Sequence, residues 1–174
     1  MISNNYVPEV ISNANIYLDG NKMVGAAAEI ELPNIKLKAN TINGMGIGGD
    51  IDSPTIGQFE SLEQKINFNT LYSSAMPMMR PDETLALTIR AAQQAYVKTG
   101  GVAQKGLRVV ERGRVKEFVP GKVKPANSME ASVTIELTYI LIEVDGETLT
   151  EIDKLNDVYI ANGKDMLADI RPLI

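Results

Sequence analysis

The sequence contains no cysteine and no histidine. The absence of cysteine excludes disulfides, thiolate nucleophiles and zinc sites built on sulfur. The absence of histidine removes the commonest general base near neutral pH and the commonest metal ligand. Carboxylate, lysine or tyrosine chemistry remains, and no cluster of these residues stands out along the chain. The sequence therefore predicts a protein that is not an enzyme and holds no metal or cofactor.

Aromatic residues and positive charge are also scarce. The chain has no tryptophan, six tyrosines and three phenylalanines, and its 17 Lys and Arg residues stand against 22 Asp and Glu, a net charge of −5. Such a surface repels phosphate backbones, and so few rings argue against a base-stacking platform. We therefore expect no specific binding of nucleic acid.

Long apolar runs are missing as well. The longest, "YILIEV" at 139–144, is far below the ~20 residues that cross a bilayer. The N-terminal "MISNNYVPEV" has neither the basic nor the apolar region of a signal peptide. We expect no membrane segment and a protein that is made and kept in the cytoplasm. A chain of 174 residues predicts one domain, 1–174, which buries roughly 70% of its unfolded surface.

Most of the secondary-structure patterns in the sequence are typical of β-strands. Alternating apolar and polar residues predict half-buried strands at 35–40, 62–68 and 106–118, and Asp-Gly at 19–20 and 145–146 predicts hairpin turns. The strand before the second turn is expected to bury Val133, Ile135, Leu137, Tyr139 and Leu141 on one face. Residues 70–81 fit a short helix or a turn-rich connection, and 162–171 fits one or two helical turns. These patterns predict a mainly β fold, an antiparallel β-sandwich or barrel with one or two short helices.

One segment, 84–97, fits two structures. Leu85, Ile89, Ala92 and Tyr96 have the spacing of a helix stripe behind an acidic first turn. Alternate residues from Leu85 to Ala91 fit a strand equally well. The residues alone leave helix and strand open here.

The stretch "NGMGIGGDIDSP" at 43–54 spells G-x-G-x-x-G. A pyrophosphate loop must precede a helix, but here Asp50 and Asp52 place negative charge where phosphate would lie and no helical stripe follows. The same aspartates occupy the first and third positions of a calcium loop, but Thr55 stands where glycine is required and Ser61 where glutamate is required. We expect neither a nucleotide nor calcium.

The glycines belong to a segment, about 40–58, that is expected to be an extended loop without secondary structure. Such a loop in a compact domain usually has a function. Apolar side chains on it, such as Met45 and Ile56, are best explained if another chain buries them. The long strands also leave edges that must be protected or paired between subunits. The predicted assembly site comprises Gly44, Met45, Gly46, Ile47, Gly48, Gly49, Asp50 and Ile51.

A second candidate surface is a basic stripe. Arg108, Arg112, Arg114 and Lys116 share one face of the predicted strand at 106–118 and could meet phosphate or an acidic partner surface. The simpler interpretation is a solvated strand face, paired with Glu130 or Glu136 on a neighbouring strand.

The order of these motifs resembles a known family. "NIYLDGNKMVGAAAEIELPNIKLKANTINGMGIGG", "RVVERGRVKEF" and above all "LTYILIEVDGETLTEIDKLNDVYIANGKDML" are similar to the major tail tube proteins of contractile-tailed bacteriophages and R-type bacteriocins. The resemblance covers the chain from about residue 14 to its end. Its most specific part is the DG-E-x-L-x-E-I-D hairpin followed by N-G-x-D, and residues 70–83 match poorly.

This resemblance implies a β-sandwich or barrel-like subunit, six copies per ring, and rings stacked into a hollow tube inside a contractile sheath, through which DNA or ions pass. It implies baseplate and tail terminator proteins as further partners, and a place in a virion tail or bacteriocin particle after synthesis in the bacterial host cytoplasm. It also assigns 84–97 to a strand, places the helix near 71–80, and gives the loop at 40–58 the task of bridging neighbouring rings.

Two other functions stay open from the residues alone. One is a monomeric β-barrel that binds a small ligand. The other is an enzyme that uses carboxylates such as Asp50 and Asp52, which would lose turnover on Asp→Asn changes without loss of assembly.

Overall fold

The computed structural model describes residues 5–23 and 29–174, and most of its regular structure is antiparallel strand. The predicted mainly β class is therefore confirmed. Residues 84–97 supply the strand β6 and not a helix, and the helix expected near 71–80 is the short 3-10 helix η1. The elements are β1 Tyr6–Leu18, β2 Asn21–Met23, β3 Leu37–Ile42, β4 Ile51–Phe59, β5 Glu63–Phe68, η1 Ser73–Met79, β6 Leu85–Val97, β7 Val102–Val119, β8 Ala131–Val144, β9 Glu147–Asp153, β10 Val158–Ala161, β11 Lys164–Asp165 and η2 Arg171–Leu173.

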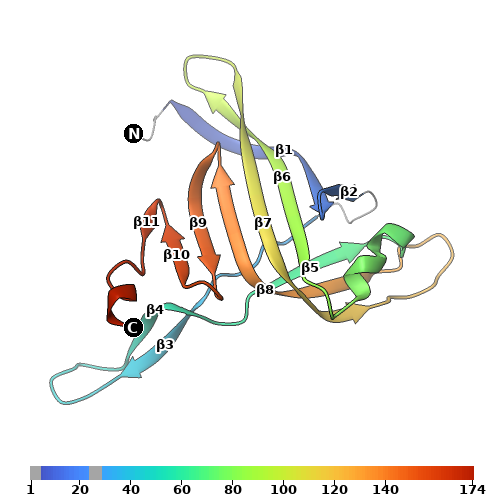
Figure 1. Ribbon diagram of the computed structural model, residues 1–174. Helices are drawn as coiled ribbons and strands as arrows, with labels where there is room; N and C mark the ends of the chain where they lie inside the picture. The colour runs from blue at the N-terminus through green and yellow to red at the C-terminus, as the bar shows by residue number, and fades with distance from the viewer. Residues whose placement is uncertain (1–4, 24–28) are drawn as a thin grey trace.

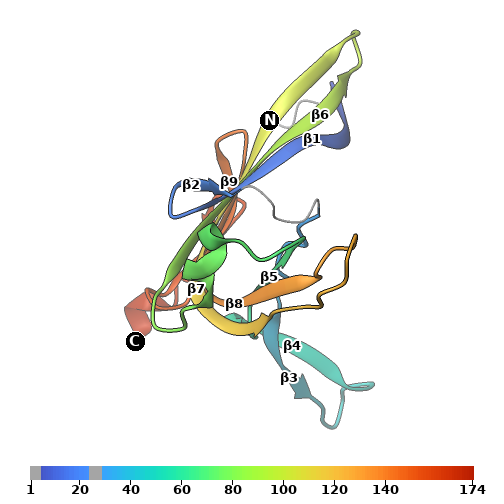
Figure 2. The ribbon, with the colours of Figure 1, turned by 90° about the vertical axis from the view of Figure 1, so that its right-hand side faces the viewer.

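Nine of the described strands form one sheet. Its order is β11-β10-β9-β8-β7-β6-β1-β2, with β5 paired to β8, while β3 and β4 form a separate two-stranded sheet. Asp-Gly turns join β1 to β2 and β8 to β9, and both residues of each turn have positive φ, as expected. The β6–β7 turn lies at the top of the molecule in Figure 1 and the β3–β4 hairpin at the lower left. In the side view the same two features point away from each other (Figure 2).

Strand β8 changes its partner halfway along its length. Residues 131–136 pair with β5, residues 139–144 pair with β9, and β7 runs along the other side of both halves. Between the halves Thr138 is an extra residue, a β-bulge opposite Arg112 and Gly113. This bulge lets one strand serve two differently oriented parts of the sheet.

The bulge also corrects the predicted inward face of this strand. Val133, Ile135 and Leu137 are buried, as expected, but the next buried residue is Ile140. Since one extra residue moves every later side chain to the opposite face, the expected continuation through Tyr139 and Leu141 is wrong. Both of those side chains are only half-buried.

The core lies between the main path of this sheet and a cover made of η1 and β5, the strand that branches from the first half of β8. Leu62, Ile66 and Phe68 face it, as predicted, and Gln64 shares the same buried face. Met78 from η1 is fully buried in the same cluster. The partners on the main sheet include Ile16, Leu18, Leu85, Leu87, Ile89, Val109, Ile140 and Ile152.

Gly113 allows the close approach at the bulge. A Cβ added there would lie 2.2 Å from the main-chain oxygen of Glu136, and a backbone atom at that distance must move. We expect Gly113→Ala to lower the unfolding free energy by about 3 kcal/mol, measured by urea unfolding. Gly106→Ala is the matched control on the same strand, because no atom of the residues that the structure describes lies within 4 Å of the new Cβ. Equal stability of the two variants would contradict the packing described here.

The segment at 40–58 is not the loop without secondary structure that its composition predicted. It contains most of the β3–β4 hairpin, whose arms pair from Leu37 with Phe59 to Ile42 with Ile51. The sequence did not reveal the two arms because they are rich in glycine and polar residues. Arms that do not pack in the core lack the regular apolar alternation from which a strand is predicted. The half-buried strand expected at 35–40 begins at Leu37, and Ala39 is exposed.

Candidate assembly surfaces

The tip of the β3–β4 hairpin presents apolar side chains to solvent. Residues 43–50 connect the arms, with the amide of Ile47 donating to the carbonyl of Gly44 at 3.1 Å. Just below the tip, the Thr41 hydroxyl donates to Asp52 Oδ1 at 2.7 Å. Met45 is fully exposed, and Ile47 and the nearby arm residues are exposed as well. The tip therefore displays apolar side chains that the described part of the subunit leaves exposed.

The base of the hairpin, in contrast, is fixed to the body. The Phe59 ring meets the Tyr159 ring of β10 edge to face, with centroids 5.0 Å apart. Gly57 has a φ of 81°, and a Cβ there would lie 2.6 Å from Cδ2 of Leu167. The amide of Glu60 donates to the carbonyl of Lys36 at 3.0 Å. These contacts hold the arms, so the exposed tip is carried at a defined position on the molecule.

The geometry of the tip differs from that of a nucleotide loop. The residues after Gly49 form the strand β4, whereas a pyrophosphate loop requires a helix N-terminus at this point. Within residues 5–23 and 29–174, no group of three or more carboxylates has the arrangement of a metal site. The same ranges contain no helix with the length and hydropathy of a membrane span.

The predicted basic stripe lies on one exposed face of β7, and two of its members form ion pairs. Arg108 Nη1 lies 3.0 Å from Glu143 Oε2 on β8. Lys116 donates to Glu63, and its ammonium lies 3.9 Å from Glu136. The hydrogen bond to Glu63 raises the pKa of Lys116, and the same bond lowers the pKa of Glu63. Of the two partners named from the sequence, Glu136 is near the stripe, while Glu130 pairs with Lys122.

For the other two arginines of the stripe, no ion pair with a carboxylate is formed among the described residues. Arg114 donates from Nε and Nη2 to the carbonyl of Pro81, at 3.0 and 2.7 Å. The Arg112 guanidinium lies over the Tyr139 ring, 4.2 Å from its centroid. Both residues lie at an exposed face. The stripe is thus fixed in place but only partly neutralised.

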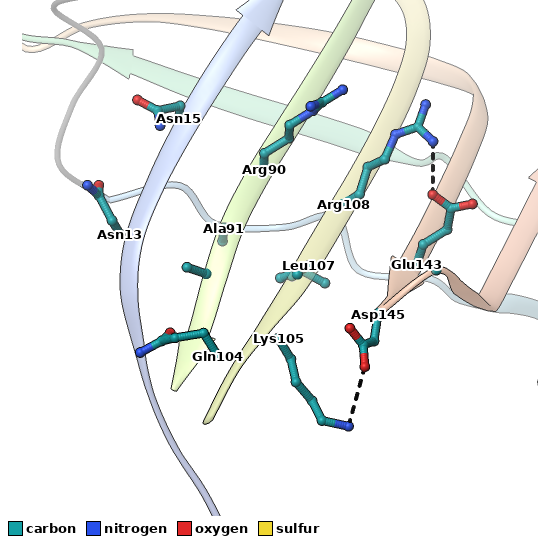
Figure 3. Close-up of a pocket in the computed structure, with 13 residues that line it drawn as sticks. Asn13, Asn15, Arg90, Ala91, Gln104, Lys105, Leu107, Arg108, Glu143 and Asp145 are labelled. Atoms are coloured by element: carbon teal, nitrogen blue, oxygen red, sulfur yellow. Dashed lines mark hydrogen bonds and ion pairs between the residues drawn. The ribbon is translucent and has the colours of Figure 1, made fainter. Parts of the chain in front are cut away.

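A shallow cavity of about 720 Å³ continues this basic region across four strands, β1, β6, β7 and β8. Figure 3 shows Arg90 on β6 beside Arg108 on β7, with the two side chains pointing the same way. Arg90 stacks on Tyr17, 5.8 Å from the ring centroid. At the other end of the cavity Lys105 lies 3.8 Å from Asp145 (Figure 3). Arg90 was missed by the sequence reasoning because it lies on another strand, and only the β6–β7 register places it opposite Arg108.

The far ends of β1, β6 and β7 form a ribbon that extends past the cover of the core (Figure 2). A groove of about 800 Å³ lies between this ribbon and the β8–β9 turn, with Tyr6, Val10, Ile11 and Leu149 among its walls. All four side chains are exposed, Val10 by 58%. Exposed apolar residues that are grouped in this way mark interaction surfaces.

The same ribbon has an open edge. β1 pairs with β6 along most of its length, but on its other side only residues 16–18 pair, with β2. Within the part of the chain that the structure describes, residues 6–15 have no strand on that side. A free edge of this length is a template for another strand.

One buried polar residue was also missed by the sequence reasoning. Glu111 on β7 is 0% exposed and lies between Leu87 and Ile140 in the sheet. Neither carboxyl oxygen has a hydrogen-bond partner in the described ranges. Burial raises the pKa of Glu111 to about 8, so the side chain is protonated at neutral pH. Its position in "RVVERGRVKEF" gave no signal, because the alternation there suits a surface charge as well.

Comparison with known proteins gives two kinds of match. A family model described as phage tail tube protein FII matches residues 8–174. The tail tube protein of Escherichia phage P2 is 26% identical over 166 residues, which cover 95% of this chain and 96% of that protein. The major tail tube protein of Serratia phage KSP20 is 27% identical over 170 residues, which cover 94% of this chain and 93% of that protein.

Proposed function

This chain belongs to the phage tail tube protein FII family, and we propose that it forms hexameric rings that stack into the hollow inner tube of a contractile tail. Its structural role in a tail tube follows from the family and from both relatives. The ring size, the stacking and the contractile setting are the proposal.

The observation that supports this proposal most strongly is that the isolated subunit leaves a strand edge unpaired and apolar side chains exposed. The open edge of β1, the apolar groove beside it and the apolar hairpin tip are all accounted for if other copies cover them. A ring closes when the same heterologous contact repeats around an axis. A monomeric ligand-binding barrel has less support, because the described strands form an open sheet and its groove is not enclosed.

We assign contact between successive rings to residues 44–51. The hairpin projects at the end of the molecule opposite the β6–β7 turn (Figures 1 and 2), so it can reach a neighbour stacked along that direction. Burial of Met45, Ile47 and Ile51 in the next ring would remove apolar area from water that the free subunit leaves exposed. The glycines allow the tip to adapt to that contact.

The wider setting follows from the same proposal. The tube lies inside a sheath protein, ends at baseplate and tail terminator proteins, and lets DNA or ions pass after the sheath contracts. The protein is made in the bacterial host cytoplasm and functions in a virion tail or bacteriocin particle. It performs no catalysis in this role.

Sedimentation velocity of the purified protein over a range of concentrations tests the proposal. We expect hexamers, and fast-sedimenting stacks of hexamers as the concentration rises. A single monomeric species at every concentration, in the presence as well as the absence of baseplate, would contradict the proposed function and favour the ligand-binding alternative.

A further inference from the structure

The chain contains two Asn-Gly pairs, Asn43-Gly44 at the tip of the β3–β4 hairpin and Asn162-Gly163 between β10 and β11. In such a pair the asparagine side chain can react with its own backbone, because glycine has no Cβ to shield the next peptide nitrogen. That nitrogen attacks the side-chain carbonyl carbon and closes a five-membered succinimide ring. Ring closure depends on the backbone conformation, and the two pairs differ in it.

The Asn162-Gly163 pair is held in a tight turn. Asn162 and Gly163 have φ values of 49° and 73°, and the flanking residues Ala161 and Lys164 pair directly. Two positive φ values in a two-residue loop define a type I′ turn, in which the next peptide nitrogen points nearly away from the Cβ of the asparagine. The amide of Asn162 also donates to the carbonyl of Leu149 at 2.7 Å. The turn must therefore open before the ring can close at this position.

The Asn43-Gly44 pair lies in no such turn. Both residues are exposed, neither belongs to a strand, and neither has a positive φ. The amide of Ile47 donates to the carbonyl of Gly44, but no backbone hydrogen bond from the Gly44 nitrogen is formed among the described residues. A Cβ built on Gly44 would meet no described atom within 4 Å, so the space around this glycine is open. The attacking nitrogen is therefore accessible in the folded subunit.

We propose that Asn43 is a site of spontaneous deamidation. The nitrogen of Gly44 forms a bond with Cγ of Asn43, the bond from Cγ to the side-chain nitrogen breaks, and ammonia leaves. Water then opens the succinimide at either of its two carbonyl carbons and gives aspartate or isoaspartate. The net reaction consumes one water molecule, releases one ammonia molecule and needs no other reactant.

Either product places a new carboxylate at the hairpin tip. Ile42 pairs with Ile51, so residue 43 and Asp50 leave the two arms side by side. The new charge therefore lies beside an existing one, on a tip whose apolar side chains are exposed. Burial of an unpaired carboxylate costs free energy, so a deamidated tip is expected to stack poorly against the next ring. This effect on stacking rests on the proposed tube function, whereas the reaction itself belongs to the free subunit.

Peptide mapping by mass spectrometry of the purified protein, held in neutral buffer, measures the reaction. We expect deamidation of Asn43 to be at least about tenfold faster than that of Asn162, because opening the paired turn breaks hydrogen bonds. Enzymatic methylation of isoaspartate identifies the second product. In concentrated urea, where no turn is held, the two asparagines should react at similar rates. An unchanged Asn43, equal rates in the folded protein, or an equally large difference in urea would overturn the proposal.

Gly44→Ala tests which atom attacks. The added methyl group shields the nitrogen of residue 44, while the open space and the φ of this position accept it without strain. Deamidation of Asn43 should therefore become at least about fivefold slower. The same rate in Gly44→Ala and in the wild type would contradict attack by this nitrogen.

Two variants of Asn43 test the effect on stacking. Asn43→Asp carries the charge of the product from the start, and Asn43→Gln remains neutral. By sedimentation velocity, we expect Asn43→Asp to need at least about tenfold more protein than the wild type to stack, and Asn43→Gln to stack normally. Equal stacking of the two variants would overturn the effect on the tube and leave the reaction to be judged by peptide mapping. Failure of the wild type to assemble would instead overturn the proposed tube function.

Discussion

Deletion of residues 45–50 is expected to abolish stacking and leave the subunit folded. The deletion joins Ile42-Asn43-Gly44 directly to Ile51, and Asn-Gly is the preferred two-residue turn between antiparallel strands. Since Ile42 and Ile51 already pair, the arms keep their register and their base keeps its contacts with the body. The lost residues are the exposed apolar tip, which is the part assigned to the neighbouring ring.

The expected result is a normal far-ultraviolet circular dichroism spectrum and at least about tenfold fewer stacked particles by sedimentation, because a few central apolar residues carry most of the energy of an interface. Met45→Asp/Ile47→Asp should have the same effect, whereas Met45→Leu/Ile47→Leu keeps apolar area of similar size and should stack normally. Stacks of normal length from the deletion variant would show that the tip is not the contact between rings.

Replacement of Glu111 by Gln is expected to stabilise the subunit increasingly as pH rises. The folded-state pKa of Glu111 is raised to about 8 from an ordinary value of 4.5. Below 4.5 the carboxyl is protonated in both states and its titration costs nothing. Between 4.5 and 8 only the unfolded chain releases the proton, so each pH unit lowers the unfolding free energy by about 1.4 kcal/mol. Above pH 8 the unfolding free energy is lowered by the full amount, up to about 5 kcal/mol.

Urea unfolding of the wild type and Glu111→Gln at pH 5 and pH 8 measures this dependence. The difference in unfolding free energy between Glu111→Gln and the wild type should increase by roughly 3 kcal/mol from pH 5 to pH 8. Glu117→Gln is the matched control, because it makes the same change at an exposed position of the same strand, and it should follow the wild type. A constant difference between the wild type and Glu111→Gln would show that the carboxyl does not titrate in this range.

Much of the fold could be predicted because local pattern and burial agree along several strands. The Asp-Gly turns, the buried face of 62–68 and the first half of β8 follow from period two and turn chemistry, and all are confirmed. The second half of β8 could not be predicted in this way. A bulge at Thr138 leaves no mark in composition, and its effect appears only when β7 and β8 are paired.

The candidate surfaces formed by consecutive residues could likewise be predicted, whereas those formed by distant strands could not. The apolar tip at 44–51 could be recognised from sequence, since isoleucine and methionine among glycines are conspicuous, although the paired arms on either side were not. The cavity beside Arg90 and the groove beside Val10 could not be recognised from the sequence, because the residues that line each of them come from strands far apart in the chain. The resemblance fixed the strand at 84–97, where Leu85 and Ile89 satisfy both helical and extended spacing.

Electron microscopy of negatively stained, purified protein tests the central claim most directly. At high concentration, and with baseplate present as a nucleus, we predict six-fold rings seen end-on and hollow rods of constant diameter seen from the side. Fields of separate small particles under both conditions, with neither rings nor rods, would contradict assembly into a tube.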